Sequence, residues 1–499
     1  MRLLYIDIDS LRADHLGCYG YPLPTTPNID ELAEECVQFS NVYSSDVPSL
    51  PSRTAVSTAM FGIRNGVVSH GGLGAELRPI GHDRGVRSPI ADQSFPATLL
   101  REGIRTVSIS SFPLRYSAPW WNNGFAETVN HMGSPLPERA HDTIPHALDW
   151  LGRNGIRDDW MMYICLQDPN RLSDRFSAPN LFKSSELPEW YTEEIRQLHW
   201  QLPGPSSAQE VGGFFPDMVH PSHLRTRDSE LAPVQIRSME DAKRVFDNYD
   251  MAVRYADDAV GQLINGLQDL GIYEDTAIVL TSGHGQALGE LGVYAGHQAA
   301  DEVTCKVPML LRWPGVEPSI NDGLHYQFDV ITTLVDLAGI EIPRHWDGES
   351  IRYDLESMAD GGRNHLVLSQ GAWSCQRSVR WSDLLYIHTF HDGFHWWPDE
   401  MLFNVVDDPH EQKDLAPFEP SLIRQGRALL DDWTFFNMDL SLSPIDPMEI
   451  VLAEGGPFQG RVNLPSYLKR LKETGRAHWA DELAKRHPTE LIEREQMAD

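Results

Sequence analysis

Alternation between short apolar runs and amphipathic helical patterns is the feature of this sequence that most constrains its fold. Apolar runs at 3–8, 160–166 and 276–281 have the length and composition of buried strands. The longest helical pattern covers 245–267 and places its apolar residues on one face over several turns. Strands that alternate with helices predict an α/β fold, with a parallel sheet covered by helices on both faces.

The same patterns divide the chain into parts. The alternation extends over 1–364, but a stretch rich in Pro, Ser and His interrupts it at about 170–238. We interpret this stretch as a surface insertion at the rim of a pocket. Residues 365–460 contain short strand-like segments, which predict a small antiparallel sheet subdomain. The last part, 461–499, is charged and helical in pattern, and we expect it to form a packing tail.

Charge and cysteine content exclude several classes of protein. The 72 acidic and 41 basic residues give a net charge of −31, which repels phosphate backbones and anionic lipids. We therefore expect no nucleic-acid partner and no membrane partner. No apolar run reaches the roughly 18 residues of a membrane-spanning helix, and the charged N-terminus lacks a signal-peptide core. Five scattered cysteines without a C-x-x-C pair favour free thiols and a cytoplasmic location. Oligomeric state has no signature in the sequence.

Two acidic residues, Asp7 and Asp9, stand at the end of the first apolar run. Residues two apart in a strand point to the same face, and α/β sheets bind ligands at the carboxyl ends of their strands. Two adjacent carboxylates are unfavourable unless a cation or a proton neutralises them, and hard divalent cations prefer oxygen ligands. The pair therefore predicts a metal site, although Asp7 could instead cap the turn through backbone hydrogen bonds.

A serine motif, Ser49-Leu50-Pro51-Ser52-Arg53, precedes a helical pattern that begins with small residues. A serine at such a junction faces backbone N–H groups and the positive end of the helix dipole, which suits an anionic substrate. Arg53 could hold both an oxyanion and the serine oxygen. Taken alone, the same pattern also fits an ordinary helix N-cap.

A glycine-rich run with two histidines follows the apolar run that ends at Thr281. His284 stands between Gly283 and Gly285, and His297 follows a further glycine. Glycines beside a histidine allow close approach of the backbone to a ligand at a strand end. Two histidines around one loop make a functional site and a structural role equally acceptable interpretations.

These runs, taken together, resemble the sulfatase family of the alkaline-phosphatase superfamily. The resemblance is carried by Asp9–Gly20, Thr26–Asp30, the serine motif, the two histidine loops, Val307–Gly315 and Phe403–Glu411. It implies an alkaline-phosphatase-like fold: a large mixed sheet with helices on both faces and a small C-terminal antiparallel sheet subdomain. It also implies hydrolysis of a small or carbohydrate sulfate ester by a formylglycine made from Cys or Ser at position 49. A calcium (or magnesium) ion would lie beside that residue.

The resemblance gives each candidate residue a role. The predicted site consists of the catalytic residues Ser49, Arg53 and His297 and the metal ligands Asp9, Asp7 and His284. In this site Ser49, converted to formylglycine or not, is the nucleophile. Arg53 orients it, and His297 lies near the leaving group.

Three departures from the family pattern concern the chemistry. Gly283 stands where the family has a metal-binding Asp, Asn170 where many relatives have a His, and Ser49 where most have Cys. Calcium takes six to eight oxygens, so the missing carboxylate predicts weak metal binding. An unmodified serine lacks a second hydroxyl and could be trapped as a sulfate ester. Three hypotheses follow: an active sulfatase, a degenerate homologue that acts by binding or assembly, and a phosphoester hydrolase that uses unmodified Ser49.

Further histidines are less informative. His388, His391 and His395 stand beside two tryptophans, and we interpret them as edge-strand and rim residues rather than a metal site. His220 and His223, in the insertion, fit either a substrate cleft or a solvated loop.

Overall fold

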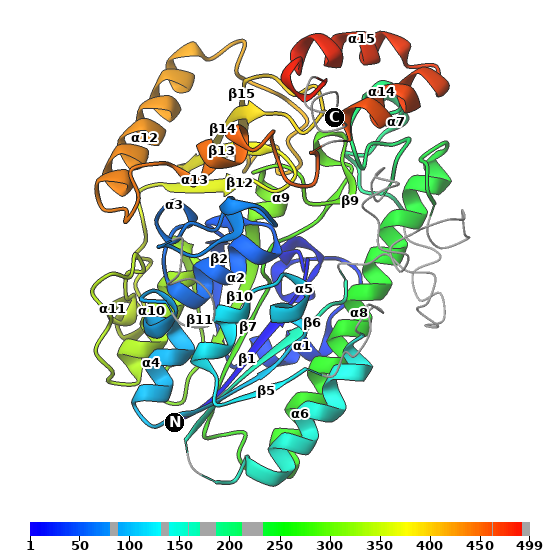
Figure 1. Ribbon diagram of the computed structural model, residues 1–499. Helices are drawn as coiled ribbons and strands as arrows, with labels where there is room; N and C mark the ends of the chain where they lie inside the picture. The colour runs from blue at the N-terminus through cyan, green and yellow to red at the C-terminus, as the bar shows by residue number, and fades with distance from the viewer. Residues whose placement is uncertain are drawn as a thin grey trace.

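An eight-stranded mixed sheet forms the centre of the computed structural model, which describes residues 1–79, 88–130, 139–157, 159–169, 186–211, 233–461 and 463–491 (Figure 1). The strand order is β11-β2-β10-β7-β1-β6-β4-β5. The strands are β1 (Arg2–Ile8), β2 (Val37–Tyr43), β4 (Arg105–Ile109), β5 (Glu127–Val129), β6 (Trp160–Leu166), β7 (Thr276–Thr281), β10 (Lys306–Arg312) and β11 (Ser319–Tyr326). β10 runs antiparallel to both of its neighbours, and the other pairs are parallel.

The three central strands confirm the prediction from the apolar runs. β6 and β7 are buried along their whole length, and β1 is buried except for its first residue. β1 pairs with β6 on one side and β7 on the other, so that Leu4 lies beside both Met162 and Ile278. A strand covered on both faces needs apolar residues without alternation, and for this reason continuous apolar runs indicated them correctly.

Helices cover both faces of the large sheet, as predicted. They are α1 (Pro27–Ala33), α2 (Ser49–Thr58), α4 (Phe95–Arg101), α6 (Ala140–Asn154), α8 (Met239–Asp269) and α10 (Gln327–Leu337). Leu3 and Tyr5 of β1 pack in a core with α2, α4 and α10, while Leu4 and Ile6 pack in a second core with α1, α6 and α8. The alternate residues of one strand thus supply two separate cores.

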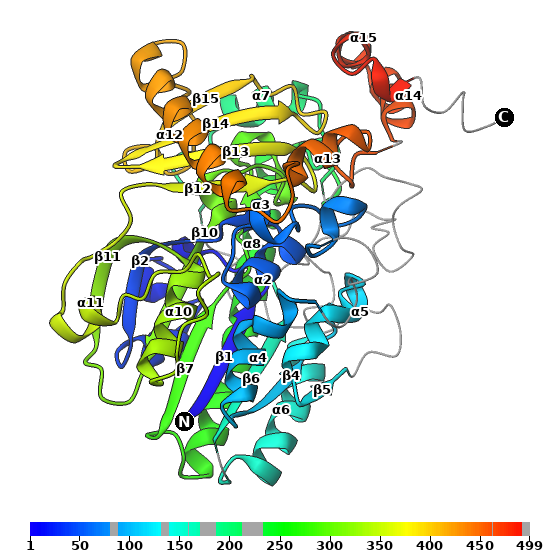
Figure 2. The same ribbon diagram turned by 60° about the vertical axis from the view of Figure 1, so that its left-hand side comes forward.

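A five-stranded sheet, with the order β15-β14-β13-β12-β3, lies beyond the end of the large sheet opposite the N-terminus (Figure 2). Its strands are β3 (Asp46–Val47), β12 (Leu366–Gln370), β13 (Cys375–Trp381), β14 (Leu384–His391) and β15 (Glu400–Asn404), and α12 (Pro420–Asp439) packs on it. β12 to β15 form the predicted antiparallel sheet. β3 pairs parallel to β12 and comes from the segment directly before Ser49, a contribution that the sequence did not predict.

The C-terminal part is helical in the described residues. It contains α13 (Pro447–Ala453), α14 (Leu464–Glu473) and α15 (Ala477–Arg486). Arg476 forms a buried ion pair with Glu210, and this pair holds the two last helices against the described part of the insertion, which includes α7 (Glu193–Gln201). The domain boundaries at residues 364 and 460 stay predictions.

The remaining elements are short. Besides several 3-10 helices, they are α3 (Gly62–Asn65), α5 (Phe112–Arg115), α9 (Glu302–Cys305), α11 (Arg352–Ser357), β8 (Ala287–Leu288) and β9 (Tyr294–Gly296). Within the described ranges, no helix has the length and apolar character to cross a membrane. All five cysteines lie in those ranges, and none is disulfide-bonded.

Candidate functional site

The six predicted site residues meet at the carboxyl edge of the large sheet. β1 brings Asp7, and Asp9 follows directly after the strand. The loop after β7 brings His284, and the first turns of α2 bring Ser49 and Arg53. The ring of His297 lies with its centroid 4.4 Å from that of His284. Five of the six side chains are buried, and His297 is partly exposed.

Arg53 is bonded to both aspartates. Its Nε donates to Asp7 Oδ2 at 2.7 Å, and its Nη2 donates to Asp7 Oδ1 at 3.1 Å and to Asp9 Oδ1 at 2.8 Å. The hydroxyl of Tyr163 donates to Asp7 Oδ2 at 2.5 Å. Burial alone lowers the pKa of Arg53, but Asp7 and its other anionic neighbours raise it well above its ordinary value. Both carboxylate oxygens of Asp7 therefore accept hydrogen bonds within a buried ion pair.

Ser49 and His284 form a buried hydrogen-bonded pair. Ser49 Oγ lies 3.0 Å from Nε2 of His284, and Nδ1 of the same ring lies 2.8 Å from the carbonyl oxygen of Gly285. A carbonyl oxygen only accepts, so Nδ1 carries the proton and the lone pair of Nε2 faces the serine hydroxyl. Burial lowers the pKa of His284, although Asp9 opposes this effect. The imidazole is therefore neutral at neutral pH and can accept the serine proton.

Gly283 packs against the guanidinium. A Cβ at this position would lie 3.4 Å from both Cζ and Nη2 of Arg53, and the carbonyl oxygen of Gly283 accepts a hydrogen bond from Ser52 Oγ at 2.5 Å. An acidic side chain here would point at the cationic group that already binds Asp7 and Asp9.

A metal ion fits this donor set poorly. Calcium requires six to eight oxygens, but three of the four oxygens of Asp7 and Asp9 accept hydrogen bonds from Arg53, and Gly283 offers no side chain. In the described ranges, the only group of three side chains suited to a metal lies elsewhere in the molecule. The residues present therefore do not fit a tightly held calcium ion, and the metal roles of Asp9, Asp7 and His284 stay predictions.

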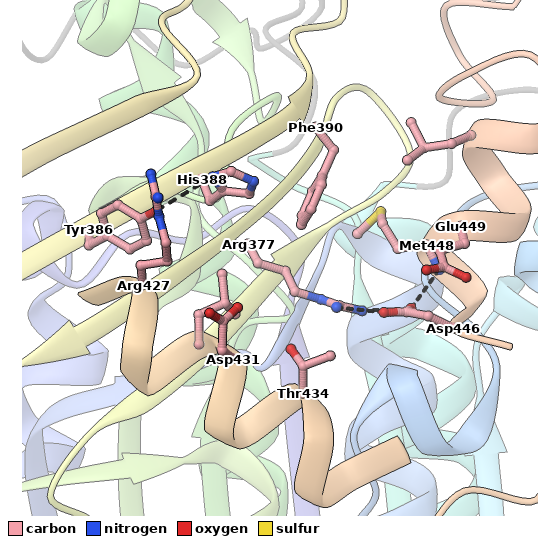
Figure 3. A pocket seen from close by; sticks show the side chains of 12 residues that line it. Arg377, Tyr386, His388, Phe390, Arg427, Asp431, Thr434, Asp446, Met448 and Glu449 are labelled. Carbon is pink, nitrogen blue, oxygen red and sulfur yellow. Dashed lines mark hydrogen bonds and ion pairs between the residues drawn. The ribbon is translucent and has the colours of Figure 1, made fainter. Parts of the chain in front are cut away.

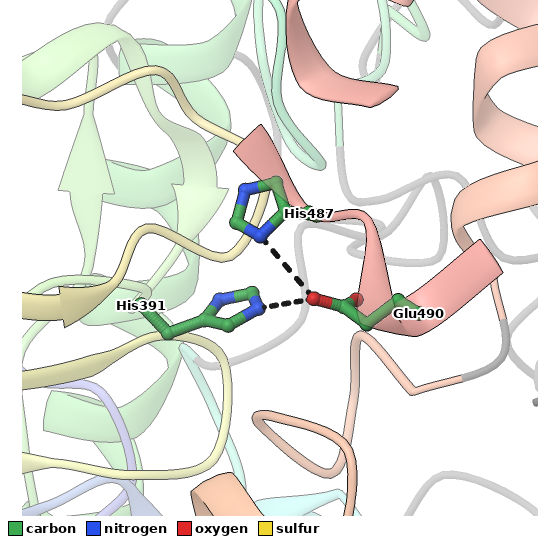
Figure 4. A group of neighbouring side chains, drawn as sticks. All are labelled: His391, His487 and Glu490. Atoms are coloured by element: carbon green, nitrogen blue, oxygen red, sulfur yellow. Dashed lines mark hydrogen bonds and ion pairs between the residues drawn. The ribbon is translucent and has the colours of Figure 1, made fainter. Parts of the chain in front are cut away.

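That other group is His391, His487 and Glu490 (Figure 4). The hydrogen bonds within this group indicate that the histidine nitrogen facing Glu490 carries a proton and does not bind a metal ion. The backbone N–H of Gly393 donates to Nδ1 of His391 at 3.0 Å, so Nε2 carries the ring proton and donates to Glu490 at 2.7 Å. A metal would need the lone pair that this tautomer lacks at Nε2.

A cavity of about 480 Å³ lies beneath the small sheet, between α12 and α13 (Figure 3). Its two arginines are engaged: Arg377 binds both carboxylate oxygens of Asp446, and Arg427 pairs with Glu400. None of the six predicted site residues lines this cavity.

Sequence reasoning missed two residues of the site, His70 and Tyr116. Their rings lie 5.1 Å apart. Burial raises the pKa of Tyr116, Asp9 adds to this rise, and a hydrogen bond with Ser49 opposes it. Burial and His284 lower the pKa of His70 to about 3. The sequence feature that could have indicated His70 is its position directly before two glycines, as His284 stands beside glycines. The predicted Asn170, His220 and His223 lie outside the described residues.

The sequence comparison decides the family. The model of the Sulfatase family matches residues 2–340. The chain belongs to the sulfatase family. This membership confirms the resemblance drawn from the motifs.

Several similar curated proteins are sulfatases whose names include an amino sugar. The chain is 25% identical over 361 residues to N-acetylgalactosamine-6-sulfatase of Mus musculus, a match that covers 67% of this chain and 62% of the mouse protein. It is 21% identical over 487 residues to N-acetylglucosamine-6-O-sulfatase of Bacteroides thetaiotaomicron, covering 83% and 82%. The chain thus spans less than two thirds of the mammalian relative's length.

Solved structures confirm the fold. A 2-O GAG sulfatase superposes with a TM-score of 0.67 at 20% identity, covering 88% of this chain and 92% of the other. A phosphonate monoester hydrolase of Agrobacterium radiobacter gives 0.64 at 17% identity, covering 87% and 96%. At these identities the likeness shows the shared fold, a large mixed sheet with a small sheet, and leaves the substrate open.

Proposed function

We propose that the protein cleaves sulfate esters with Ser49 as the nucleophile and His284 as its base. One observation carries this proposal: Ser49 Oγ lies 3.0 Å from the unprotonated Nε2 of a histidine whose other nitrogen is fixed by a backbone carbonyl. Family membership supplies the sulfate ester.

In the proposed first step, His284 Nε2 takes the proton of Ser49 while Oγ attacks the sulfur. The bond from sulfur to the leaving oxygen breaks, this oxygen keeps the electron pair and takes a proton from solvent, and the sulfuryl group is transferred to Oγ while His284 holds the serine proton. The N-terminus of α2 offers backbone N–H groups to the anionic group, and Arg53 supplies the adjacent positive charge. The Nη1 atom of Arg53 binds neither aspartate and is the nitrogen available for an oxyanion. His297 is neutral, because burial lowers its pKa, and lies on the leaving-group side in this proposal.

The second step decides turnover. A serine that carries a sulfuryl group has no second hydroxyl with which to expel sulfate, so the ester accumulates. Formylglycine made from Ser49 would supply that hydroxyl, and its formation stays a prediction. A calcium or magnesium ion, predicted from the family, enters no step here because the donor set does not fit it.

The substrate that we propose is a small or carbohydrate sulfate ester, by analogy with the relatives named for N-acetylgalactosamine and N-acetylglucosamine sulfates. We also propose a cytoplasmic location. A second candidate function is phosphoester hydrolysis by unmodified Ser49. The phosphonate monoester hydrolase among the structural neighbours shows that this fold also accommodates phosphorus chemistry.

The test uses protein whose Ser49 is shown by mass to be unmodified. Incubation with 4-nitrophenyl sulfate should release one equivalent of nitrophenol, and the peptide that contains Ser49 should gain a sulfuryl group. Ser49→Ala and His284→Ala should abolish this burst, while Ser57→Ala, in the same helix, should keep it.

Three other outcomes are informative. Continuous turnover of 4-nitrophenyl phosphate, with only a burst or nothing from the sulfate, would favour the phosphoester alternative. No reaction with either ester would favour the degenerate homologue. Fast turnover of the sulfate by unmodified protein would contradict the proposed trapping at Ser49.

A further inference from the structure

A segment near the C-terminus, residues 454–461, lies against the loop that carries His70. The ring of Phe458 packs so closely on Gly71 that a Cβ there would overlap it. The Oε1 of Glu454 accepts a hydrogen bond from the backbone of Leu73 at 3.0 Å. These contacts fix the segment at the edge of the site that contains Ser49.

Gln459, in this segment, reaches the ring of His70. Its Nε2 lies 3.3 Å from Nδ1 of His70, and its backbone N–H donates to the carbonyl of Ala372 at 3.0 Å. An amide nitrogen donates and does not accept, so Nδ1 of His70 must be the acceptor. In a neutral imidazole the proton then belongs to Nε2.

The Nε2 of His70 is buried and makes no hydrogen bond with the described residues. Buried polar atoms in folded proteins almost always have a partner, so an N–H without one calls for an acceptor that is supplied from outside. The electrostatic neighbours of His70 are His284, Asp9 and Arg53, which places the ring at the catalytic site. Because Nδ1 accepts a hydrogen bond from Gln459, the ring carries one proton and is neutral while it donates.

We propose that Nε2–H of His70 donates a hydrogen bond to an oxygen of the sulfate group, and that Gln459 is the positioning residue that fixes this tautomer. The inference rests on the proposed function for the identity of the anion. A neutral donor binds an oxygen without adding another full charge beside Arg53. The C-terminal segment thereby controls the proton arrangement of the anion site.

The experiment measures two quantities on the whole chain, the affinity for inorganic sulfate by calorimetry and the His70 tautomer by ¹⁵N NMR. Gln459→Glu replaces the donor by an acceptor and should move the proton to Nδ1. Gln459→Met, which is neutral, should give a mixture of tautomers. Sulfate affinity should fall in the order natural chain, Gln459→Met, Gln459→Glu, with a loss of at least about tenfold for the last.

His70→Phe, which keeps a ring but has no donor, should lose a similar factor. Gln262→Glu on the exposed face of α8 adds the same charge elsewhere and should change neither quantity. Thermal melting of each variant confirms that it is folded.

Several outcomes would overturn the proposal. They are a natural chain with the proton on Nδ1, a weaker affinity in Gln459→Glu without a change of tautomer, and a natural chain that does not bind sulfate. Ser49→Ala separates the two proposals, because it should keep both the tautomer and the sulfate affinity. Sulfate binding without any reaction at Ser49 would count against the proposed function alone.

Discussion

Gly283 is the single residue that most changes the charge balance of the site. With glycine there, Arg53 is the cation that binds both Asp7 and Asp9. Gly283→Asp would add a third carboxylate, with its Cβ 3.4 Å from the guanidinium. We expect calcium to bind weakly or not at all to the natural chain and measurably to the variant, as followed by calorimetry.

Gly283→Asn is the matched control for this prediction, since it has a similar size without the charge. It should gain much less calcium affinity. Nanomolar binding by the natural chain would show that other oxygens complete the metal site.

Asp7 is a residue whose removal should cost stability. Asp7→Asn leaves Arg53 buried with one carboxylate instead of two, and breaking a buried ion pair destabilises a protein by about 3 kcal/mol or more. Tyr163→Phe keeps the ion pair and removes a hydrogen bond to the same carboxylate and a longer one from Arg53 Nε, and it should cost less, about 1 to 2 kcal/mol. Urea unfolding of both variants measures the difference. Equal stability of Asp7→Asn and the natural chain would contradict the ion-pair interpretation.

The sequence located the site residues but not their partners. The family resemblance predicted that Asp9, Ser49 and His284 would belong to one site, and the structure brings the three side chains together. The bidentate bond of Arg53 to Asp7 depends on how a long side chain from α2 lies, which no spacing encodes. His70 was missed because its loop follows no apolar run.

Among the elements, α15 and the residues after it are joined to the small sheet by a charged contact. Nε2 of His487 lies 2.9 Å from Asp392 Oδ1, and its Nδ1 lies 3.2 Å from Glu490 Oε1. Burial lowers the pKa of His487, but both carboxylates raise it, to about 9. Arg486 also binds Asp392, at 3.1 Å. The contact depends on the proton of His487.

This contact predicts a stability that falls in alkali. The folded pKa of His487 is above its ordinary value of 6.5, so its stabilisation is complete below about pH 6.5 and is lost as pH rises through about 9. The shift corresponds to roughly 3 kcal/mol. Hydrogen exchange in α15, measured at pH 6 and pH 10, should show the loss in the natural chain.

His487→Gln should flatten this dependence, whereas His478→Gln, at an exposed position in α15, should keep it. A natural chain with the same protection at both pH values would be evidence against a protonated His487.

At the scale of elements, the sequence predicted long buried strands well and short ones poorly. β3 has two residues, too few to show any periodicity. The segment 401–406 is strand-like in composition, but β15 ends at Asn404, and Val406 beyond it is 61% exposed. In the sequence, apolar residues that follow the end of a strand cannot be distinguished from apolar residues within it, because burial is not known.

The whole molecule has a net charge of −31, and like charges on one surface repel each other. Salt shortens the range of this repulsion from about 30 Å at 10 mM to about 8 Å at physiological ionic strength. We expect the melting temperature to rise by several degrees between these conditions in sodium chloride. An equal rise in sodium acetate would separate screening from specific binding of chloride. A melting temperature that falls with salt would mean that ion pairs outweigh the net repulsion.

β3, which pairs with β12 of the small sheet, lies in the sequence directly before the proposed nucleophile, Ser49. Two residues after β3, Ser49 begins α2, so the small sheet holds one side of the backbone that presents the serine. The C-terminal region therefore cannot be replaced independently of the segment that contains Ser49. A chimera that took this region from another family member would inherit a new support for Ser49, and the two halves would have to be selected together.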